Sequence, residues 1–211
     1  MRVCVLLALI CPVGCGENGG QQTGKGADPI DLLPALDEGV RLVLEAETGK
    51  AEPAMAVAGF EPYRHEVKGM QRASGGKCVV VPKDANRECK ATPENPKGKP
   101  PVGKLTLDFT VPEDGTYYIY PRTWWRESCW NSFHLSVDGA KPLVVTDTTY
   151  KVWHWVMLMA DGGNNTPRPF RLKKGKHELV FMNREDDVKL DQVYITDDPD
   201  DRPAGIMKVD K

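Results

Sequence analysis

A strict alternation of apolar and polar residues in the middle of the chain limits the folds open to it. In the segment KLTLDFTV, residues 104–111, every second residue is apolar and the residues between are polar or charged. Side chains of a β-strand point alternately to its two faces, so this pattern predicts a strand with one buried side. The turn-forming segment PEDG follows directly. The apolar face consists of Leu105, Leu107, Phe109 and Val111.

Further β-type segments follow at short intervals. The segment NSFHLSVDG alternates in the same way and ends in Asp138-Gly139, a dipeptide favoured in tight hairpin turns. No later run of ten or more residues has a convincing helical period. Many short strands with polar Gly- and Pro-containing turns predict an all-β fold, an antiparallel β-sandwich (jelly roll). The other β-rich runs are TYYIYPRT, LVVTD, YKVWHWVMLM, FRLKKGKHELVFMN and KLDQVYIT.

The borders of this region are less regular. Residues 31–43, DLLPALDEGVRLV, fit either a short helix broken by Pro34 or a loop that enters a strand. The last residues, DDPDDRPAGIMKVDK, predict an acidic turn followed by a short, loosely packed tail.

The start of the chain has the order of a signal peptide: a basic residue, a short apolar run, and the small Gly14 before Cys15. The run is shorter than the ~20 apolar residues of a membrane-spanning helix. Its end resembles a lipobox, although Pro12 stands where that pattern prefers leucine. We expect residues 1–14 to be removed and Cys15 to be acylated. The protein would then be a membrane-anchored lipoprotein at the cell envelope, with ordinary secretion as the alternative.

Composition separates a linker from one folded domain. Residues 15–30 are rich in Gly and Gln and predict a flexible tether, which leaves residues 31–211 as a single domain. The chain has 40% hydrophobic and 27% charged residues, as globular proteins do. Its formal net charge of -2 gives no sign of a polyanion partner, so binding to nucleic acid is not expected.

Three cysteines, Cys78, Cys89 and Cys129, lie in the expected domain. For an exported protein the simplest outcome is one disulfide between the nearest pair, Cys78 and Cys89, with one thiol left over. The alternative is that all three are reduced. Zinc binding is disfavoured because no CxxC pair and no histidine at ligand spacing accompanies them.

Several segments carry a resemblance to a known family through their order and spacing. They are LVLEAET, ASGGKCVVVP, LTLDFTVPEDGTYYIYPRT with NSFHLSVDG, VWHWVML, and KGKHELVFMNREDDVKLDQVYIT. Together they resemble the jelly-roll carbohydrate-binding modules of families 6 and 35, including those appended to bacterial glycoside hydrolases. The resemblance covers about residues 42–196 and implies binding of a polysaccharide or other glycan without catalysis.

The resemblance also implies a structural calcium ion. Such modules hold it with acidic residues of the first and last strands, and here Glu45, Glu47 and Asp191 stand in those places. Carboxylate oxygens are the ligands that calcium prefers. The alternative is that Glu45 and Glu47 are a solvated strand face.

All five tryptophans lie between residues 124 and 155. A sugar ring is apolar on its C–H faces, so its binding site needs a flat aromatic surface ringed by hydrogen-bonding groups. Trp124 and Trp125 are adjacent and cannot both enter a core from an extended segment, so we expect at least one to be exposed as the stacking ring. Trp155 is expected in the core. Trp130 and Trp153 can belong to either.

Polar residues beside the tryptophans complete the expected ligand site. Arg122 and Arg126 can each hold a carboxylate or a pair of hydroxyls, with Glu127 beside them. The alternative for the arginines is a salt bridge to Glu127 or Asp186. By the resemblance, Asn183 corresponds to a polar sugar contact, and otherwise it is a turn residue.

The sequence gives little support for catalysis. It contains no GxSxG, HExxH or P-loop motif, and His134 and His154 are expected at the surface or at an edge. We therefore expect a protein that is not an enzyme. One alternative is a small glycoside hydrolase or polysaccharide lyase on the same fold, with Glu127 and Asp186 as its acid pair. Another is a surface adhesion protein that binds another protein.

Overall fold

The computed structural model describes four stretches of the chain. They are residues 39–59, 72–83, 103–161 and 165–209. The chain divides into two compact units, Met1–Asp37 and Glu38–Lys211, and all described residues belong to the second. The expected signal peptide, the acylated Cys15 and the tether lie outside the described residues. None of the described helical segments is long and apolar enough to span a membrane.

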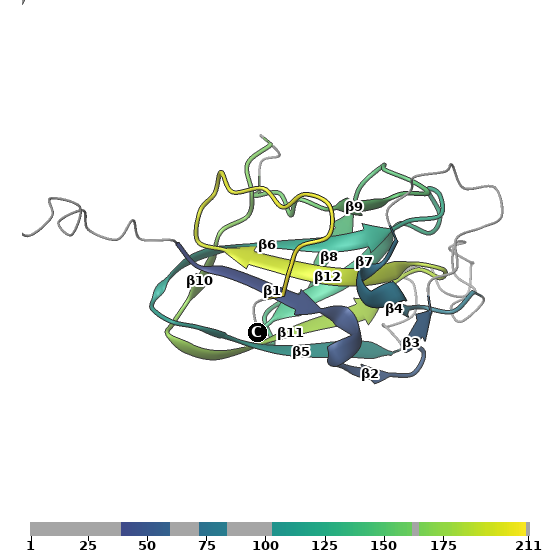
Figure 1. Ribbon diagram of the computed structural model, residues 1–211, viewed down its shortest axis with the longest axis horizontal. Coiled ribbons are helices and arrows are strands. Elements are labelled where there is room, and N and C mark those ends of the chain that lie inside the picture. The colour runs from purple at the N-terminus through teal and green to yellow at the C-terminus, as the bar shows by residue number, and fades with distance from the viewer. Residues whose placement is uncertain (1–38, 60–71, 84–102, 162–164, 210–211) are drawn as a thin grey trace, which may run out of the picture. The chain divides into compact units, whose positions relative to one another are not determined.

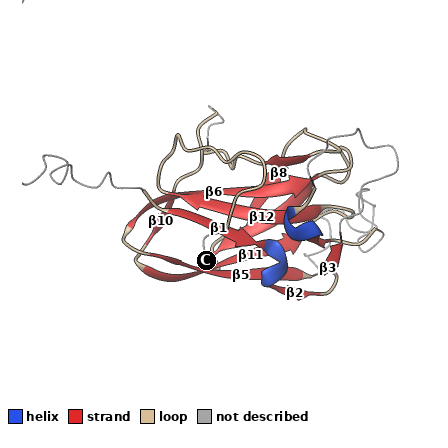
Figure 2. Cartoon of the chain, viewed as in Figure 1, coloured by secondary structure: helices blue, strands red, loops and turns tan. Residues whose placement is uncertain are grey.

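The described residues form twelve strands in two sheets, with two short 3-10 turns (Figure 1, Figure 2). In the seven-stranded sheet the order is β10 (Phe170–Leu172), β6 (Gly115–Trp124), β12 (Lys189–Thr196), β4 (Lys77–Val80) and β3 (Ala56–Gly59). In addition, β1 (Arg41–Glu45) pairs with β12, and β9 (Trp153–Trp155) pairs with β6. In the five-stranded sheet the order is β2 (Lys50–Glu52), β5 (Lys104–Val111), β11 (Gly175–Asn183), β7 (Ser132–Val137) and β8 (Leu143–Thr146). The 3-10 turns are η2 (Ala46–Thr48) and η3 (Ser74–Gly76).

Every strand pairing in both sheets is antiparallel, which confirms the expected all-β antiparallel sandwich. The alternating face of β5 is buried as predicted, because Leu105, Leu107, Phe109 and Val111 all belong to the main core. The hairpin turn between β7 and β8 is also confirmed. Asp138 and Gly139 have φ angles of 49° and 71°, the left-handed values that tight hairpin turns require.

The buried residues form two clusters. The main core lies between the sheets and includes inward residues of both, such as Ile119 of β6 and Phe181 of β11. A smaller cluster lies on the outer face of the seven-stranded sheet, the face turned away from the main core. Its members are Ala73, Cys78, Trp124 and Trp153. The seven-stranded sheet is therefore buried on both faces at this end.

The structure describes residues 39–43 of the first border segment and residues 197–209 of the last one. Strand β1 begins at Arg41, which favours a loop and strand entry over a helix for the described part of residues 31–43. The tail that was expected to be loosely packed is not: residues 201–207 contact the outer face of the seven-stranded sheet through several hydrogen bonds. That expectation was wrong because its residues were judged without the partners that the sheet provides.

Candidate functional site

Trp125 follows the end of β6 and is buried, as is Trp124, with 0% and 1% of their surfaces exposed. The expectation that at least one of these rings is exposed is therefore wrong. Trp125 points into the main core, where its ring centroid lies 5.4 Å from that of Phe133. Its indole Nε1 donates a hydrogen bond to Asp147 Oδ1 at 3.0 Å. The ring is thus a core element with its one polar atom satisfied.

Trp124 points to the opposite side of β6, as the alternation of a strand requires. It is buried there as well, because Ala73, Cys78 and Trp153 pack around it on the outer face. The ammonium Nζ of Lys189 lies 3.9 Å from the centroid of the Trp124 ring. Trp153 is only 4% exposed, so it too belongs to a buried cluster. None of these buried rings offers a face on which a sugar could stack.

Arg122 and Asp191 form an ion pair whose two side chains are completely buried. The guanidinium also donates to the carbonyl of Arg72 at 3.3 Å and lies over the Trp153 ring at 5.4 Å. The other carboxylate oxygen of Asp191 accepts a hydrogen bond from Ser74 N at 2.8 Å. Burial raises the pKa of Asp191 to about 6, against the opposing effect of Arg122. Because Arg122 is completely buried and paired with Asp191, the expected role of Arg122 as an exposed sugar ligand is not supported. The expected role of Asp191 as a calcium ligand stays a prediction.

Four residues near the end of the seven-stranded sheet form a continuous chain of contacts, which we call the edge cluster. They are Arg126, Trp130, Asp187 and Lys189. The guanidinium of Arg126 lies 4.9 Å from the Trp130 ring centroid and its Nη1 donates to Asp187 Oδ2 at 3.1 Å. Lys189 Nζ donates to Asp187 Oδ1 at 2.9 Å. The Lys189 ammonium then reaches the buried Trp124 ring, so three charged side chains lie in series between the Trp130 and Trp124 rings.

Backbone hydrogen bonds fix the two loops that carry these side chains. Between β6 and β7, Arg126 N donates to the Trp130 carbonyl at 3.3 Å, and Trp130 N donates to the Glu127 carbonyl at 2.8 Å. In the β11–β12 loop, Asp187 has φ 54° and its N donates to the carbonyl of Val81 at 2.9 Å. These bonds fix the backbone of the two loops from which the Trp130 ring and the Asp187 carboxylate project.

The edge cluster combines the two kinds of surface that a sugar ring requires. Trp130 is half-buried, and the side chain of Arg126 is 31% exposed, more than those of Asp187 and Lys189 at 12% and 13%. The guanidinium of Arg126 lies over the Trp130 ring, and Asp187 and Lys189 continue the chain of polar groups from it. An aromatic ring together with nearby donors and an acceptor is the combination with which proteins bind sugars. Two cations face one carboxylate, so the cluster carries a net positive charge.

Arg126 forms its ion pair with neither Glu127 nor Asp186, the two carboxylates expected from the sequence. Asp187 takes that position, whereas Asp186 is only 4% exposed and Glu127 is exposed. A buried carboxylate and an exposed one do not line a common open cleft, so this arrangement does not support Glu127 and Asp186 as a glycosidase pair.

Asn183 ends β11 with its side chain completely buried. It lies opposite Phe133 in the β11–β7 register, on the side that faces the main core. Neither side-chain atom has a hydrogen-bond partner among the described residues. An exposed sugar contact at Asn183 is therefore not supported.

Trp155 differs from its expected place in the core. It is half-buried on the outer face, with its ring centroid 6.4 Å from that of Tyr194, and belongs to neither buried cluster. The expectation of a surface or edge position for His134 and His154 is met only in part, because both are half-buried. A ring nitrogen of His154 lies 3.0 Å from Asp147.

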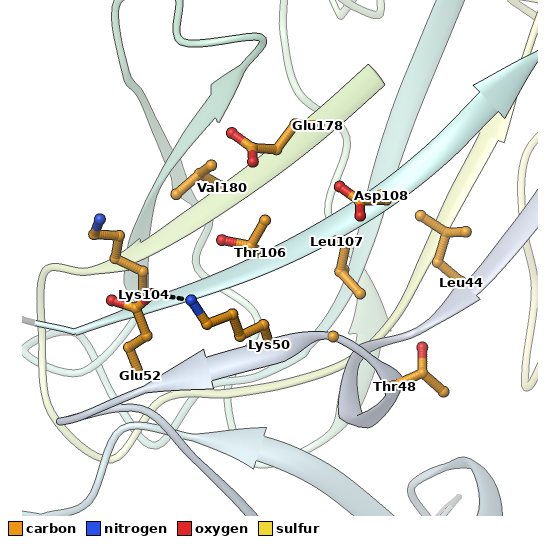
Figure 3. A pocket seen from close by; sticks show the side chains of 11 residues that line it. Leu44, Thr48, Lys50, Glu52, Lys104, Thr106, Leu107, Asp108, Glu178 and Val180 are labelled. Carbon is orange, nitrogen blue, oxygen red and sulfur yellow. Dashed lines mark ion pairs between the residues drawn. The ribbon is translucent and has the colours of Figure 1, made fainter. Parts of the chain in front are cut away.

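A groove of about 610 Å³ lies over the outer side of strands β2, β5 and β11 (Figure 3). Thr106 and Asp108, which the alternation of β5 places on the solvent side, both line it. Lys50 and Glu52 form an ion pair at its border at 3.2 Å. None of the side chains that line this groove is aromatic, so it lacks the flat ring that the edge cluster provides.

The acidic residues of the first strand keep unsatisfied oxygens. Glu45 Oε1 accepts hydrogen bonds from Ser74 Oγ at 2.7 Å and Gln192 Nε2 at 2.9 Å. Glu45 Oε2 and Glu47 Oε2 are buried and have no hydrogen-bond partner in the described part of the chain. Burial, reinforced by Glu45, raises the pKa of Glu47. Across the described stretches, no group of three or more His, Cys, Asp or Glu side chains could hold a metal ion.

Cys78 is buried as a free thiol, and burial raises its pKa to about 12. This counts against the expected disulfide between Cys78 and Cys89, although Cys89 lies outside the described residues. Cys129 is exposed in the loop between β6 and β7. The buried thiol fills space beside Trp124 in the smaller cluster.

Sequence reasoning assigned Arg126 to the ligand site and left Trp130 open, but it missed Asp187 and Lys189. Both lie in the segment REDDVKL, where an acidic loop meets the first residue of β12. The mixture of acidic and basic residues in this segment can be read from the sequence. Its position beside the loop of Trp130 cannot, because that position depends on the pairing of β12 with β6.

Comparisons with known proteins give no sequence family, because neither a family model nor a curated protein matches the chain. Among solved structures, the chain is similar to the exo-β-1,3-galactanase of Phanerochaete chrysosporium, with 17% identity and a TM-score of 0.46. That match covers 74% of this chain but 29% of the galactanase, so the chain spans less than a third of that enzyme's length.

Two further similar structures are covered almost completely. One is the C-terminal family 6 carbohydrate-binding module of LamC, a laminarinase from Zobellia galactanivorans, with 14% identity and a TM-score of 0.45 over 74% of this chain and 99% of that one. The other is a family 35 carbohydrate-binding module from Clostridium thermocellum, with 12% identity and a TM-score of 0.45 over 74% and 97%. At such identities and scores, these similarities assign no function by themselves.

Proposed function

We propose that this protein binds carbohydrate at the edge cluster and catalyses no reaction. The observation that carries the proposal is the half-buried Trp130 ring, held beside Arg126 in a fixed chain of donors and acceptors. Ligand sites of this kind need one aromatic anchor and a few oriented polar groups, and both are present here. The expected binding is shallow and of modest affinity.

The position of the edge cluster beside the first residue of β12 is also compatible with display from a surface. Lys189 begins this strand and Thr196 ends it, so roughly 23 Å separate them at about 3.3 Å per residue. Arg41, the first residue of β1, pairs with Thr196. The chain therefore enters the sandwich at the end of β12 away from the edge cluster, which suits a domain tethered through its N-terminus.

A glycan array probed with the mature chain, residues 15–211, tests the proposed function. We expect binding to at least one glycan class, with no new reducing ends or unsaturated products after prolonged incubation with that glycan. Binding accompanied by turnover would favour the glycoside hydrolase or lyase alternative. An array without any signal would contradict carbohydrate binding.

We further propose that calcium binds between Glu45 and Glu47. Each residue contributes one buried carboxylate oxygen that lacks a hydrogen-bond partner among the described residues. Calcium prefers hard oxygen ligands and completes its shell with backbone carbonyls and water, so two carboxylates can be enough to begin a site. Bound there, the ion would offset the repulsion between the two carboxylates and fix the end of β1.

Calcium is accordingly expected to raise the melting temperature by roughly 5–10 °C, since a hundredfold excess over Kd adds about 2.7 kcal/mol to the folded state. Differential scanning calorimetry with calcium and with EDTA measures the shift. Glu47→Gln should abolish it, whereas Glu113→Gln, at an exposed turn position, should leave it intact. A shift of the same size in Glu47→Gln would place the ion elsewhere.

We also propose that the mature protein begins at an acylated Cys15, because a short apolar run and Gly14 precede this residue. Mass spectrometry of the membrane fraction should find a lipid-modified N-terminal Cys15. Cys15→Ala should move the protein from the membrane fraction to the soluble fraction. An unmodified N-terminus at another residue would contradict this proposal.

A further inference from the structure

Glu185 lies in the β11–β12 loop, two residues before Asp187 of the edge cluster, and contacts the loop that carries Trp130. Its carboxylate oxygen Oε2 accepts a hydrogen bond from Asn131 N at 2.8 Å and another from Ser132 Oγ at 2.6 Å. Asn131 directly follows Trp130 in the chain. One carboxylate oxygen therefore joins the two loops from which the edge cluster is built.

This contact lies where the pairing of β7 with β11 stops. The last pair of that ladder is Phe133 with Asn183. If the antiparallel register continued, Asn131 would lie opposite Glu185. The side-chain carboxylate of Glu185 thus accepts the Asn131 N–H in place of a backbone carbonyl, and the loop leaves the sheet in a defined direction.

Neighbouring groups hold the Glu185 side chain in its orientation. Its other oxygen, Oε1, accepts from Arg184 Nη1 at 2.8 Å, and the same guanidinium nitrogen donates to Ser132 Oγ at 2.5 Å. The hydroxyl of Ser132 therefore accepts from Arg184 and donates to Glu185. The Glu185 side chain is only 13% exposed, and a carboxylate so far removed from water is stable only where donors surround it. These donors restrict the carboxylate to the position that bonds the Trp130 loop.

A different carboxylate contacts the residues on both sides of the same loop. Asp147 Oδ1 accepts from Trp125 Nε1 at 3.0 Å, and the Asp147 carbonyl accepts from Asn131 Nδ2 at 2.6 Å. A change at Asp147 would therefore disturb the core ring of Trp125 as well. The hydrogen bonds of Glu185 go to the end of the loop and the start of β7, so its effect on the loop can be measured separately.

We infer that Glu185 is a positioning residue for the edge cluster. Its hydrogen bond to Asn131 fixes the backbone next to Trp130 relative to the loop that carries Asp187. Glu185 thus acts through the Trp130 ring, not by contact with the sugar. A loop that must be ordered on binding lowers the affinity, and Glu185 removes that cost beforehand. The inference rests on the carbohydrate binding proposed at the edge cluster.

Glu185→Ala and Glu185→Gln test this role by isothermal titration with the array-selected glycan. Glutamine keeps a carbonyl oxygen that can accept from Asn131 and Ser132, whereas alanine keeps no acceptor. We expect Glu185→Ala to bind at least about tenfold more weakly than the parent, and Glu185→Gln to stay within about threefold of it. Parent-like affinity in Glu185→Ala overturns the inference, as does a glutamine variant that binds as weakly as the alanine variant.

Asp201→Ala is the matched control for loss of a partly buried carboxylate. The Asp201 side chain is 19% exposed and accepts from Tyr194 Oη at 2.6 Å and from Arg41 Nε at 2.7 Å. These contacts lie towards the end of β12 that is away from the edge cluster, where Arg41 pairs with Thr196. Asp201→Ala should keep its affinity within about threefold of the parent. An equal loss of affinity in both alanine variants would overturn the positioning role.

Fluorine NMR of protein labelled with fluorotryptophan reports on the Trp130 ring without any sugar. Substitution of Trp130 and of Trp155 by phenylalanine assigns their lines. In Glu185→Ala the Trp130 line should shift or broaden, whereas the Trp155 line, from the outer face, should stay in place. If Glu185→Ala does not fold, Ser132→Ala removes one of the two bonds and should move the same line.

An unchanged Trp130 line in the folded variant overturns the inference, whether or not a glycan binds. The proposed function fails separately. If Trp130→Ala keeps the parent's affinity while Glu185→Ala moves the Trp130 line, Glu185 positions the ring and the sugar binds elsewhere.

Discussion

Replacing Trp125 by alanine is expected to lower the free energy of unfolding by about 4 kcal/mol, because a fully buried ring leaves a large cavity. The ring packs on Phe133 inside the main core, and its Nε1 bonds Asp147. The variant would therefore lose both packing and a partner for the Asp147 carboxylate. Urea unfolding followed by circular dichroism measures the change.

The substitution Trp125→Phe serves as the matched control. It keeps an aromatic ring in the core and removes only part of the volume and the indole N–H, so about half the loss is expected. Had Trp125 been an exposed sugar-stacking ring, alanine would change the unfolding free energy by less than about 0.5 kcal/mol. That smaller value would contradict the core position.

The alternation that predicted β5 correctly also explains the error at Trp124 and Trp125. Adjacent residues of a strand do point to opposite faces, and these two rings obey that rule. An exposed ring is expected only where a single face of the strand is covered, and both faces of β6 are covered here. Ala73 and Cys78, both more than 45 residues earlier in the chain, cover the other face of β6. Packing between such distant residues cannot be predicted from the local sequence pattern.

Assignments that depend on partners far apart in the chain were the least predictable. Arg122 and Asp191 were given separate functions, yet they are 69 residues apart in sequence and form one buried ion pair. A residue's type and neighbours define what chemistry it can perform. The bulge-containing register between β6 and β12 decides which partner it meets.

In the candidate site, too, the residues of one loop could be predicted from the sequence, whereas the residues that join them from another part of the chain could not. The sequence placed a tryptophan- and arginine-rich loop between β6 and β7, and Arg126 and Trp130 of the edge cluster come from it. The acidic and basic residues that complete the cluster are Asp187, from the β11–β12 loop, and Lys189, the first residue of β12. Their arrival beside Trp130 could be derived only from strand order.

Replacing Trp130 by alanine is the second change for which we expect a large effect, here on binding. Aromatic anchors of this kind contribute about 2 kcal/mol or more, so Kd for the bound glycan should rise at least about thirtyfold. The ring is only half-buried and packs at the border of the core, so the free energy of unfolding should fall by no more than about 2 kcal/mol. Trp130→Ala should thus lose binding and keep its fold, whereas Trp125→Ala should lose stability.

Trp155→Ala is the matched control, because Trp155 is also half-buried but lies on the outer face against Tyr194. Arg126→Ala should weaken binding as well, since it removes a cationic hydrogen-bond donor from the edge cluster and leaves Asp187 with Lys189 alone. Both variants should remain folded, as judged by circular dichroism.

Isothermal titration of one array-selected glycan into the parent protein, Trp130→Ala and Trp155→Ala tests the proposed edge site most directly. We predict measurable binding to the parent, an affinity within about threefold of the parent for Trp155→Ala, and at least about thirtyfold weaker binding for Trp130→Ala. Unchanged affinity in folded Trp130→Ala would contradict carbohydrate binding at the edge cluster.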